Sequence, residues 1–198
     1  MPKRRPRVAV IAFDGISPFH LSVPCMVFGE EKDARGLPRY DVQVCSESTG
    51  PLRTNAGFLI NVQSSLSALR CADLVIVPSW SDTLAPASDE LLSALRKAHA
   101  RGATVVGLCL GAFVLAQSGL LDGRTATTHW MAATEFRLRY PAVHMRPEVL
   151  YVDEGDLGRV NAIGVLAPLF IKSQAWKSRL SNSRRLNTAC RLNGATSV

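Results

Sequence analysis

The sequence predicts an α/β domain with a mainly parallel sheet. Short apolar runs rich in β-branched residues, typical of strands buried on both faces, alternate with helical segments and are joined by short turns. The clearest of these runs are residues 7–13, 74–77 and 104–108. With 198 residues the chain has room for one domain with a full core and little more.

The first half of the chain is predicted to begin with a strand and a helix. After the strand at 7–13, Ser17 and Pro18 open the helix as its N-cap and first residue. Pro24 lacks the backbone N–H that a helix interior needs, so we expect it to bend or interrupt this helix. The next predicted elements are a strand at 41–45, a hairpin or strand pair at 52–62 and a strand at 74–77.

The second half repeats the alternation of helix and strand. Ser88 is predicted to cap a helix that runs to Ala100, with acidic residues in the first turn and an apolar stripe along one side. Glycines at the ends of segment 119–123 indicate a turn. The other predicted elements are a strand at 104–108, a helix at 131–139 and a short strand at 149–152.

Charge is distributed unevenly along the chain. All 16 acidic residues lie at or before Asp156, and residues 1–157 balance them with 16 lysines and arginines. The formal net charge of +7 therefore comes entirely from residues 158–198. We expect an α/β domain at 1–157 followed by a basic tail at 158–198 with weak or irregular structure. A solvated extension is favoured for this tail over a surface for nucleic acid or anionic membranes.

The cysteines and the N-terminus indicate where the protein works. The five cysteines form no C-x-x-C pair, so neither a metal site nor a disulfide framework is predicted, and the odd count suits a reducing compartment. The apolar run after the basic N-terminus is too short for a secretory or membrane-spanning segment. We therefore expect a cytoplasmic protein with no cofactor, no metal and no membrane partner.

The most informative motif is the stretch from Gly107 to Gly111, which has the pattern G-x-C-x-G. It follows a predicted strand and precedes a helical segment, as a nucleophile elbow does, with the sulfur of Cys109 in place of the usual serine oxygen. Glycines tolerate the sharp turn and the close approach of strand and helix. We expect Cys109 to project beside a helix N-terminus that favours its thiolate, the alternative being a buried structural cysteine.

A nucleophilic cysteine needs an acid–base partner and an oxyanion hole. His129 is the candidate imidazole, with a packed structural histidine as the equally weighted alternative. The backbone N–H groups of Ser79 and Leu110 are the candidate oxyanion donors. His20 lies in the first predicted helix, where a lone histidine usually serves packing.

These motifs resemble a known family. Residues 107–130, which include the glycine-flanked Cys109 and the sequence Ala-Thr-Thr-His-Trp, look like the PfpI/ThiJ superfamily, also called class I glutamine amidotransferase-like. Residues 7–29 and 149–156 resemble the sensor domain of AraC-type transcriptional regulators. The resemblance implies a flavodoxin-like three-layer α/β/α sandwich, usually dimeric, with Cys109 at the elbow. Isonitrile hydratases of the same superfamily share the pattern around Cys109 and His129.

The chain departs from the superfamily at several positions. His20 stands where a carboxylate is common, Leu110 where the hydratases often carry a hydroxyl, and Ser79 where a glycine is expected. After residue 157 the likeness ends, and no helix-turn-helix segment follows. A change of reading frame near residue 158 and a diverged tail that packs in its own way are both compatible with this loss, and a nonfunctional truncated product is a weaker alternative.

The departures favour binding over catalysis. The resemblance implies a small-molecule-sensing domain of an AraC-type regulator that lacks its helix-turn-helix domain, with a pocket around Cys109 that includes His20. The alternative is a cysteine-dependent isonitrile hydratase or amidase-like enzyme that uses Cys109 and His129. The resemblance also implies a homodimer. We do not expect this chain alone to read DNA specifically, because base readout needs an element that enters a groove.

Overall fold

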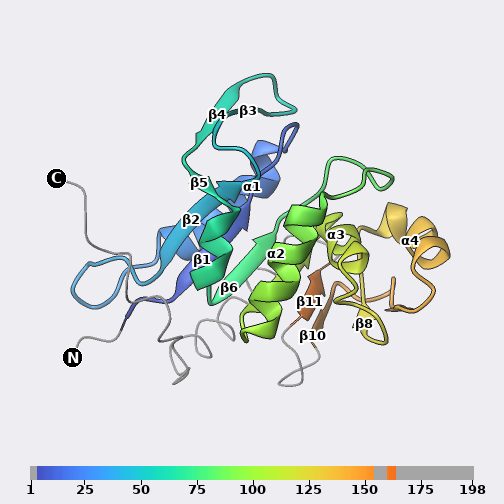
Figure 1. Cartoon of the computed structure of the whole chain (residues 1–198). Coiled ribbons are helices and arrows are strands. Elements are labelled where there is room, and N and C mark those ends of the chain that lie inside the picture. The colour runs from blue at the N-terminus through green and yellow to red at the C-terminus, as the bar shows by residue number, and fades with distance from the viewer. Residues whose placement is uncertain (1–3, 154–159, 164–198) are drawn as a thin grey trace.

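A central, mostly parallel sheet organises the structure, a computed structural model that describes residues 4–153 and 160–163 (Figure 1). In the described residues the sheet has seven strands in the order β10-β11-β7-β6-β1-β2-β5, and only the β10–β11 pair is antiparallel. The strands are β1 (Arg7–Ile11), β2 (Asp41–Ser46), β5 (Ser64–Ser65), β6 (Leu74–Val77), β7 (Thr104–Leu108), β10 (Tyr151–Asp153) and β11 (Val160–Ile163). The predicted fold class is confirmed.

Alternate residues of the central strands face opposite layers. Val8 and Val10 of β1 are fully buried with the apolar side of α1 (Pro18–Gly29). Ala9 and Ile11 belong to the core on the other side, which is covered by α2 (Asp89–Ala100) and α3 (Gly111–Gln117). This period of two is what a strand buried between two helical layers requires, and it produces the three-layer sandwich.

Smaller elements surround this sandwich. They are the hairpin β3 (Gly50–Arg53) and β4 (Leu59–Val62), the 3₁₀ helices η1 (Leu66–Cys71) and η2 (Trp130–Ala132), helix α4 (Ala133–Arg139), and the strand pair β8 (Thr125–Ala126) and β9 (His144–Met145). The hairpin confirms the strand pair predicted at 52–62. A membrane-crossing helix would need a longer apolar stretch than any helix among the described residues provides.

The two predicted helix starts behave differently. Ser88 caps α2 as expected, because its hydroxyl accepts a hydrogen bond from the Leu91 backbone N–H at 3.1 Å. Ser17 is the N-cap residue of α1 but makes no capping bond with its side chain. Helix α1 continues through Pro24 to Gly29, so the expected interruption is not seen. Packing of Val23 and Phe28 against the sheet holds the turns on either side of the proline.

Two expectations from the sequence need correction. Val160–Ile163 form β11, which pairs in parallel with β7, so irregular structure is wrong for these four residues. An unpaired edge of β7 would leave backbone groups exposed, and an extended segment satisfies them. Cys71 takes part in a disulfide bond, although the spacing predicted no disulfide framework. Residues 154–159 and 164–198 lie outside the described part, so the boundary at 157 and the character of the tail stay predictions.

The turn from β7 to α3 depends on two glycines. A Cβ on Gly107 would lie 2.9 Å from the backbone nitrogen of Ala112. A Cβ on Gly111 would overlap the carbonyl oxygen of Val77, the last residue of β6. The missing side chains therefore let α3 begin directly against the ends of two strands.

Substituting Gly111 by alanine is expected to destabilise the fold. The added methyl group meets rigid backbone rather than a flexible side chain, so we expect a loss of about 3 kcal/mol in the free energy of unfolding. Urea denaturation followed by circular dichroism measures this loss. Gly29→Ala is the matched control, because a Cβ there meets no atom within 4 Å. Equal stability of the two variants would contradict the close approach.

Candidate functional site

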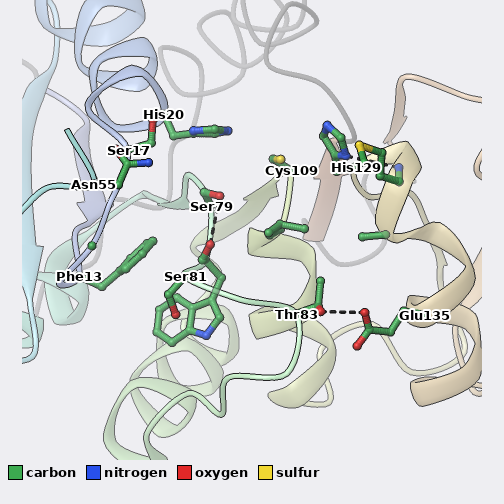
Figure 2. A pocket seen from close by; sticks show the side chains of 15 residues that line it. Phe13, Ser17, His20, Asn55, Ser79, Ser81, Thr83, Cys109, His129 and Glu135 are labelled. Carbon is green, nitrogen blue, oxygen red and sulfur yellow. Dashed lines mark hydrogen bonds between the residues drawn. The ribbon is translucent and has the colours of Figure 1, made fainter.

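A cavity of about 470 Å³ opens at the carboxyl ends of β1, β6 and β7 (Figure 2). Within the sheet, β2 lies next to β1 on one side, and β6 and then β7 lie on its other side. The direction in which strands are added to the sheet therefore reverses at β1. Open α/β sheets bind ligands at such a reversal. The lining residues are Phe13, Gly15, Ser17, His20, Asn55, Ser79, Trp80, Ser81, Thr83, Cys109, Leu110, His129, Met131, Ala132 and Glu135.

All five residues singled out in the sequence line this one cavity. They are His20, Ser79, Cys109, Leu110 and His129. They come from α1, from the loop after β6, from the turn after β7 and from the segment before η2. Their placement together agrees with the expected pocket, and their individual roles stay predictions.

Cys109 sits at the sharpest point of the turn after β7. Its φ of +52° is the only positive value at a non-glycine residue in the described part of the chain. A left-handed conformation costs an L-residue about 1–2 kcal/mol, so the surrounding packing must hold it. The Thr128 hydroxyl contributes by donating a hydrogen bond to the Cys109 carbonyl oxygen at 2.8 Å.

The thiol of Cys109 is buried, with 7% of the residue exposed. Burial raises its pKa above the ordinary range, while hydrogen bonds from the Leu110 backbone N–H and the Ser79 side chain oppose that rise. The net effect keeps the sulfur protonated at neutral pH. The thiolate expected from a helix N-terminus is therefore not favoured, because desolvation outweighs the donors.

Ser79 is accommodated without backbone strain. Its φ is not positive, so a residue with a Cβ fits where the resemblance led us to expect glycine. The residue is buried, and its hydroxyl also lies 3.5 Å from the Trp80 carbonyl oxygen, a long and weak contact. The side chain of Ser79 thus acts on the Cys109 sulfur.

His20 and His129 lie on either side of Cys109 (Figure 2). Burial, and to a smaller extent the charge of His129, lowers the pKa of His20. The Nδ1 atom of His20 is buried and has no hydrogen-bond partner. His20 is thus a neutral imidazole in the cavity at neutral pH, at the position where the resemblance implies a carboxylate.

His129 has one ring nitrogen already engaged. Its Nδ1 accepts a hydrogen bond from the Met131 backbone N–H at 3.4 Å, and its ring stacks on Trp130 with centroids 5.8 Å apart. When the ring is neutral, its proton is therefore on Nε2. In this form Nε2 donates a hydrogen bond and cannot accept the thiol proton.

The structure adds lining residues that the sequence did not single out. Phe13 and Trp80 form an aromatic wall with ring centroids 4.8 Å apart, and the Trp80 indole N–H is fixed by the Ala85 carbonyl oxygen at 3.0 Å. At another side Thr83 donates to the Glu135 carboxylate at 2.7 Å. These two residues are 52 positions apart, so no local pattern could have paired them. In the described residues no group of three or more His, Cys, Asp and Glu side chains could hold a metal ion.

Comparison with known proteins gives a consistent result over most of the chain. The model of the DJ-1/PfpI family matches residues 6–157. The HTH-type transcriptional regulator CdhR of Pseudomonas aeruginosa is 35% identical over 114 residues, 58% of this chain and 34% of that protein. An uncharacterized protein from the cpoL 5′ region of Streptomyces lividans is 34% identical over 138 residues, 69% of this chain and 96% of that protein. The match thus spans about a third of CdhR's length.

A third relative is an enzyme, and solved structures share the fold. The isonitrile hydratase of Pseudomonas putida is 28% identical over 95 residues, 48% of this chain and 42% of the enzyme. A THiJ/PfpI family protein from Pseudomonas syringae superposes with a TM-score of 0.72 at 19% identity, over 89% of this chain and 69% of that chain. An AraC family transcriptional regulator from Pseudomonas putida superposes with a TM-score of 0.67 at 19% identity, over 88% of this chain and 92% of that chain.

The Cys109 thiol is expected to alkylate slowly. Because its pKa is raised, less thiolate is present at neutral pH than in free cysteine, whose pKa is about 8.5. Iodoacetamide labelling followed by peptide mass spectrometry should give a labelling rate below that of free cysteine. The rate should rise with pH, and the midpoint of that rise should lie above the pKa of the free cysteine thiol. Ser79→Ala should lower the rate further, because it removes a donor to the sulfur. Labelling faster than free cysteine would contradict the protonated thiol.

Proposed function

Because the chain belongs to the DJ-1/PfpI family, we propose that it is a small-molecule-sensing domain of the AraC-type regulator kind, with the Cys109 cavity as its ligand site. The observation that carries the proposal is the cavity itself, which combines an aromatic wall with several converging polar groups around a thiol that burial keeps protonated. Ligand sites are typically apolar clefts with a few placed polar groups. CdhR, a transcriptional regulator, is among the relatives.

The cavity is suited to convert ligand binding into a change of shape. Its lining comes from α1 on one face of the sheet, from the β3–β4 hairpin at Asn55, and from α4 at Glu135. A ligand that contacts all three segments stabilises one arrangement of them over others, and that difference in affinity is what a sensor needs. The hairpin turn is tied to the strand-to-helix loop by the Asn55 backbone N–H, which donates to the Ile16 carbonyl oxygen at 3.2 Å.

The second candidate is a cysteine-dependent isonitrile hydratase or amidase-like enzyme. The relationship to an isonitrile hydratase and the positive φ of Cys109, as expected of a nucleophile elbow, favour it. Against it stand the raised pKa of the thiol and the engaged Nδ1 of His129. An attacking sulfur must lose its proton to a base, and the Nδ1 of His129 is not free to receive it.

Three further features belong to the proposal. We expect a homodimer, a cytoplasmic location and no sequence-specific DNA reading by the described domain. The support for the first two is the family resemblance, and that for the third is the absence of a groove-entering element among the described residues.

A thermal-shift screen separates sensor from enzyme. A sensor predicts that at least one metabolite raises the melting temperature, because a ligand at about 100 times its Kd adds about 2.7 kcal/mol of stability. Cys109→Ala should keep this shift, since the thiol is not consumed, and Cys25→Ala on α1 is the matched control. Turnover of isonitriles or amides by the native chain, lost in Cys109→Ala, would instead establish the enzyme. No shift with any metabolite would contradict the sensor.

A further inference from the structure

The end of the cavity beside Cys109 has a composition that the proposed function leaves unexplained. Two imidazoles, His20 and His129, lie on either side of the thiol (Figure 2). We propose that this end is a subsite for the carboxylate of a small ligand, and that one proton is taken up from solvent when the carboxylate binds. The inference rests on the proposed function only in that the cavity takes a small molecule.

The donors around this end suit an anion. His129 presents Nε2–H because its Nδ1 accepts from the Met131 backbone, whereas the Leu110 backbone N–H and the Ser79 hydroxyl already donate to the Cys109 sulfur beside it. The Asn55 side chain also lines the cavity. A carboxylate accepts several hydrogen bonds at once, and bonds to a charged acceptor are about twice as strong as neutral ones.

The negative charges near this end are already compensated. Glu135 is the only carboxylate among the lining residues of the described chain, and it accepts from Thr83 at 2.7 Å and pairs with Arg139 at 3.6 Å. Asp14 is not a lining residue of the cavity, and its carboxylate accepts the Arg53 backbone N–H at 2.9 Å. The Cys109 thiol is neutral because burial raises its pKa. An incoming carboxylate therefore meets two imidazoles, and Glu135, the one lining carboxylate in the described chain, is already paired.

His20 is the imidazole that takes up the proton without losing a hydrogen bond. Protonating His129 would break the hydrogen bond that its Nδ1 accepts from Met131. His20 has no such bond to lose, because its Nδ1 has no partner in the free protein. Burial and the facing His129 disfavour the imidazolium in the empty cavity, and an adjacent carboxylate reverses that preference. Binding thus converts neutral His20 into an imidazolium paired with the ligand.

The aromatic wall of the cavity indicates what the rest of the ligand is like. Phe13 and Trp80 pack with ring centroids 4.8 Å apart, and the Trp80 indole N–H is occupied by the Ala85 carbonyl oxygen. This wall offers apolar contact and no free donor from the indole. The chemical class that fits both ends is a small carboxylate with an apolar or aromatic body.

Benzoate and benzamide form a suitable probe pair, because they share a shape and differ in charge. Titration calorimetry of the whole chain should show benzoate binding more tightly than benzamide at about pH 6, with its affinity falling about tenfold for each pH unit above the pKa of free His20. Buffers of different ionisation enthalpy should report uptake of one proton per benzoate. Benzamide binding should not depend on pH.

Single substitutions identify the histidine that takes up the proton. His20→Gln should weaken benzoate binding at least tenfold near pH 6 and abolish both the pH dependence and the proton uptake. His129→Gln should weaken binding but keep the pH dependence, because His20 remains. His144→Gln, in β9 and outside the cavity, is the matched control and should behave like the native chain. Circular dichroism confirms that each variant is folded.

The possible outcomes are distinct. Equal affinity for benzoate and benzamide, pH-independent benzoate binding, or unchanged proton uptake in His20→Gln would each overturn the carboxylate subsite. If benzoate does not bind while a metabolite still raises the melting temperature, the subsite is wrong and the sensing function stands. If benzoate binds as described and the screen finds no metabolite, the subsite stands and the sensing role loses its support.

Discussion

The close approach of Gly111 to the end of β6 is the constraint on which the site depends. A Cβ at Gly111 would overlap the Val77 carbonyl oxygen, so α3 can begin at this point only without a side chain there. The short path from β7 to α3 then leaves Cys109 with a φ of +52°. That angle directs the thiol to the carboxyl ends of the strands, where the loops after β1 and β6 begin. Without this contact neither the turn nor the cavity would have its shape.

The packing that forms the site also determines its chemistry. Burial raises the pKa of Cys109 and lowers that of His20, so both groups are neutral at the pH at which a nucleophile and a base would have to be ready. A neutral, partly polar cavity is a good binding site, because its polar groups gain hydrogen bonds when a ligand replaces water. The same neutrality is a barrier to covalent catalysis, which needs a thiolate. The physical chemistry of the cavity thus favours binding over turnover.

Position 20 shows how one residue can change what a shared fold is able to bind. A carboxylate there would repel an anionic ligand, whereas an imidazole facing His129 attracts one and can gain a proton. The scaffold around it is the one shared with regulators and with an isonitrile hydratase. Function on such a scaffold follows from the lining of the site rather than from the arrangement of strands.

Local patterns in the sequence determined the fold class, the Ser88 cap and the strand-to-helix turn around Cys109, because these features depend on residues a few positions apart. Only the tertiary structure decided the passage of α1 through Pro24, the addition of β11 to the sheet, and the pairing of Thr83 with Glu135. It also decided the protonation states of Cys109 and His20. These outcomes depend on burial and on contacts between distant segments, and no short stretch of sequence encodes either of them.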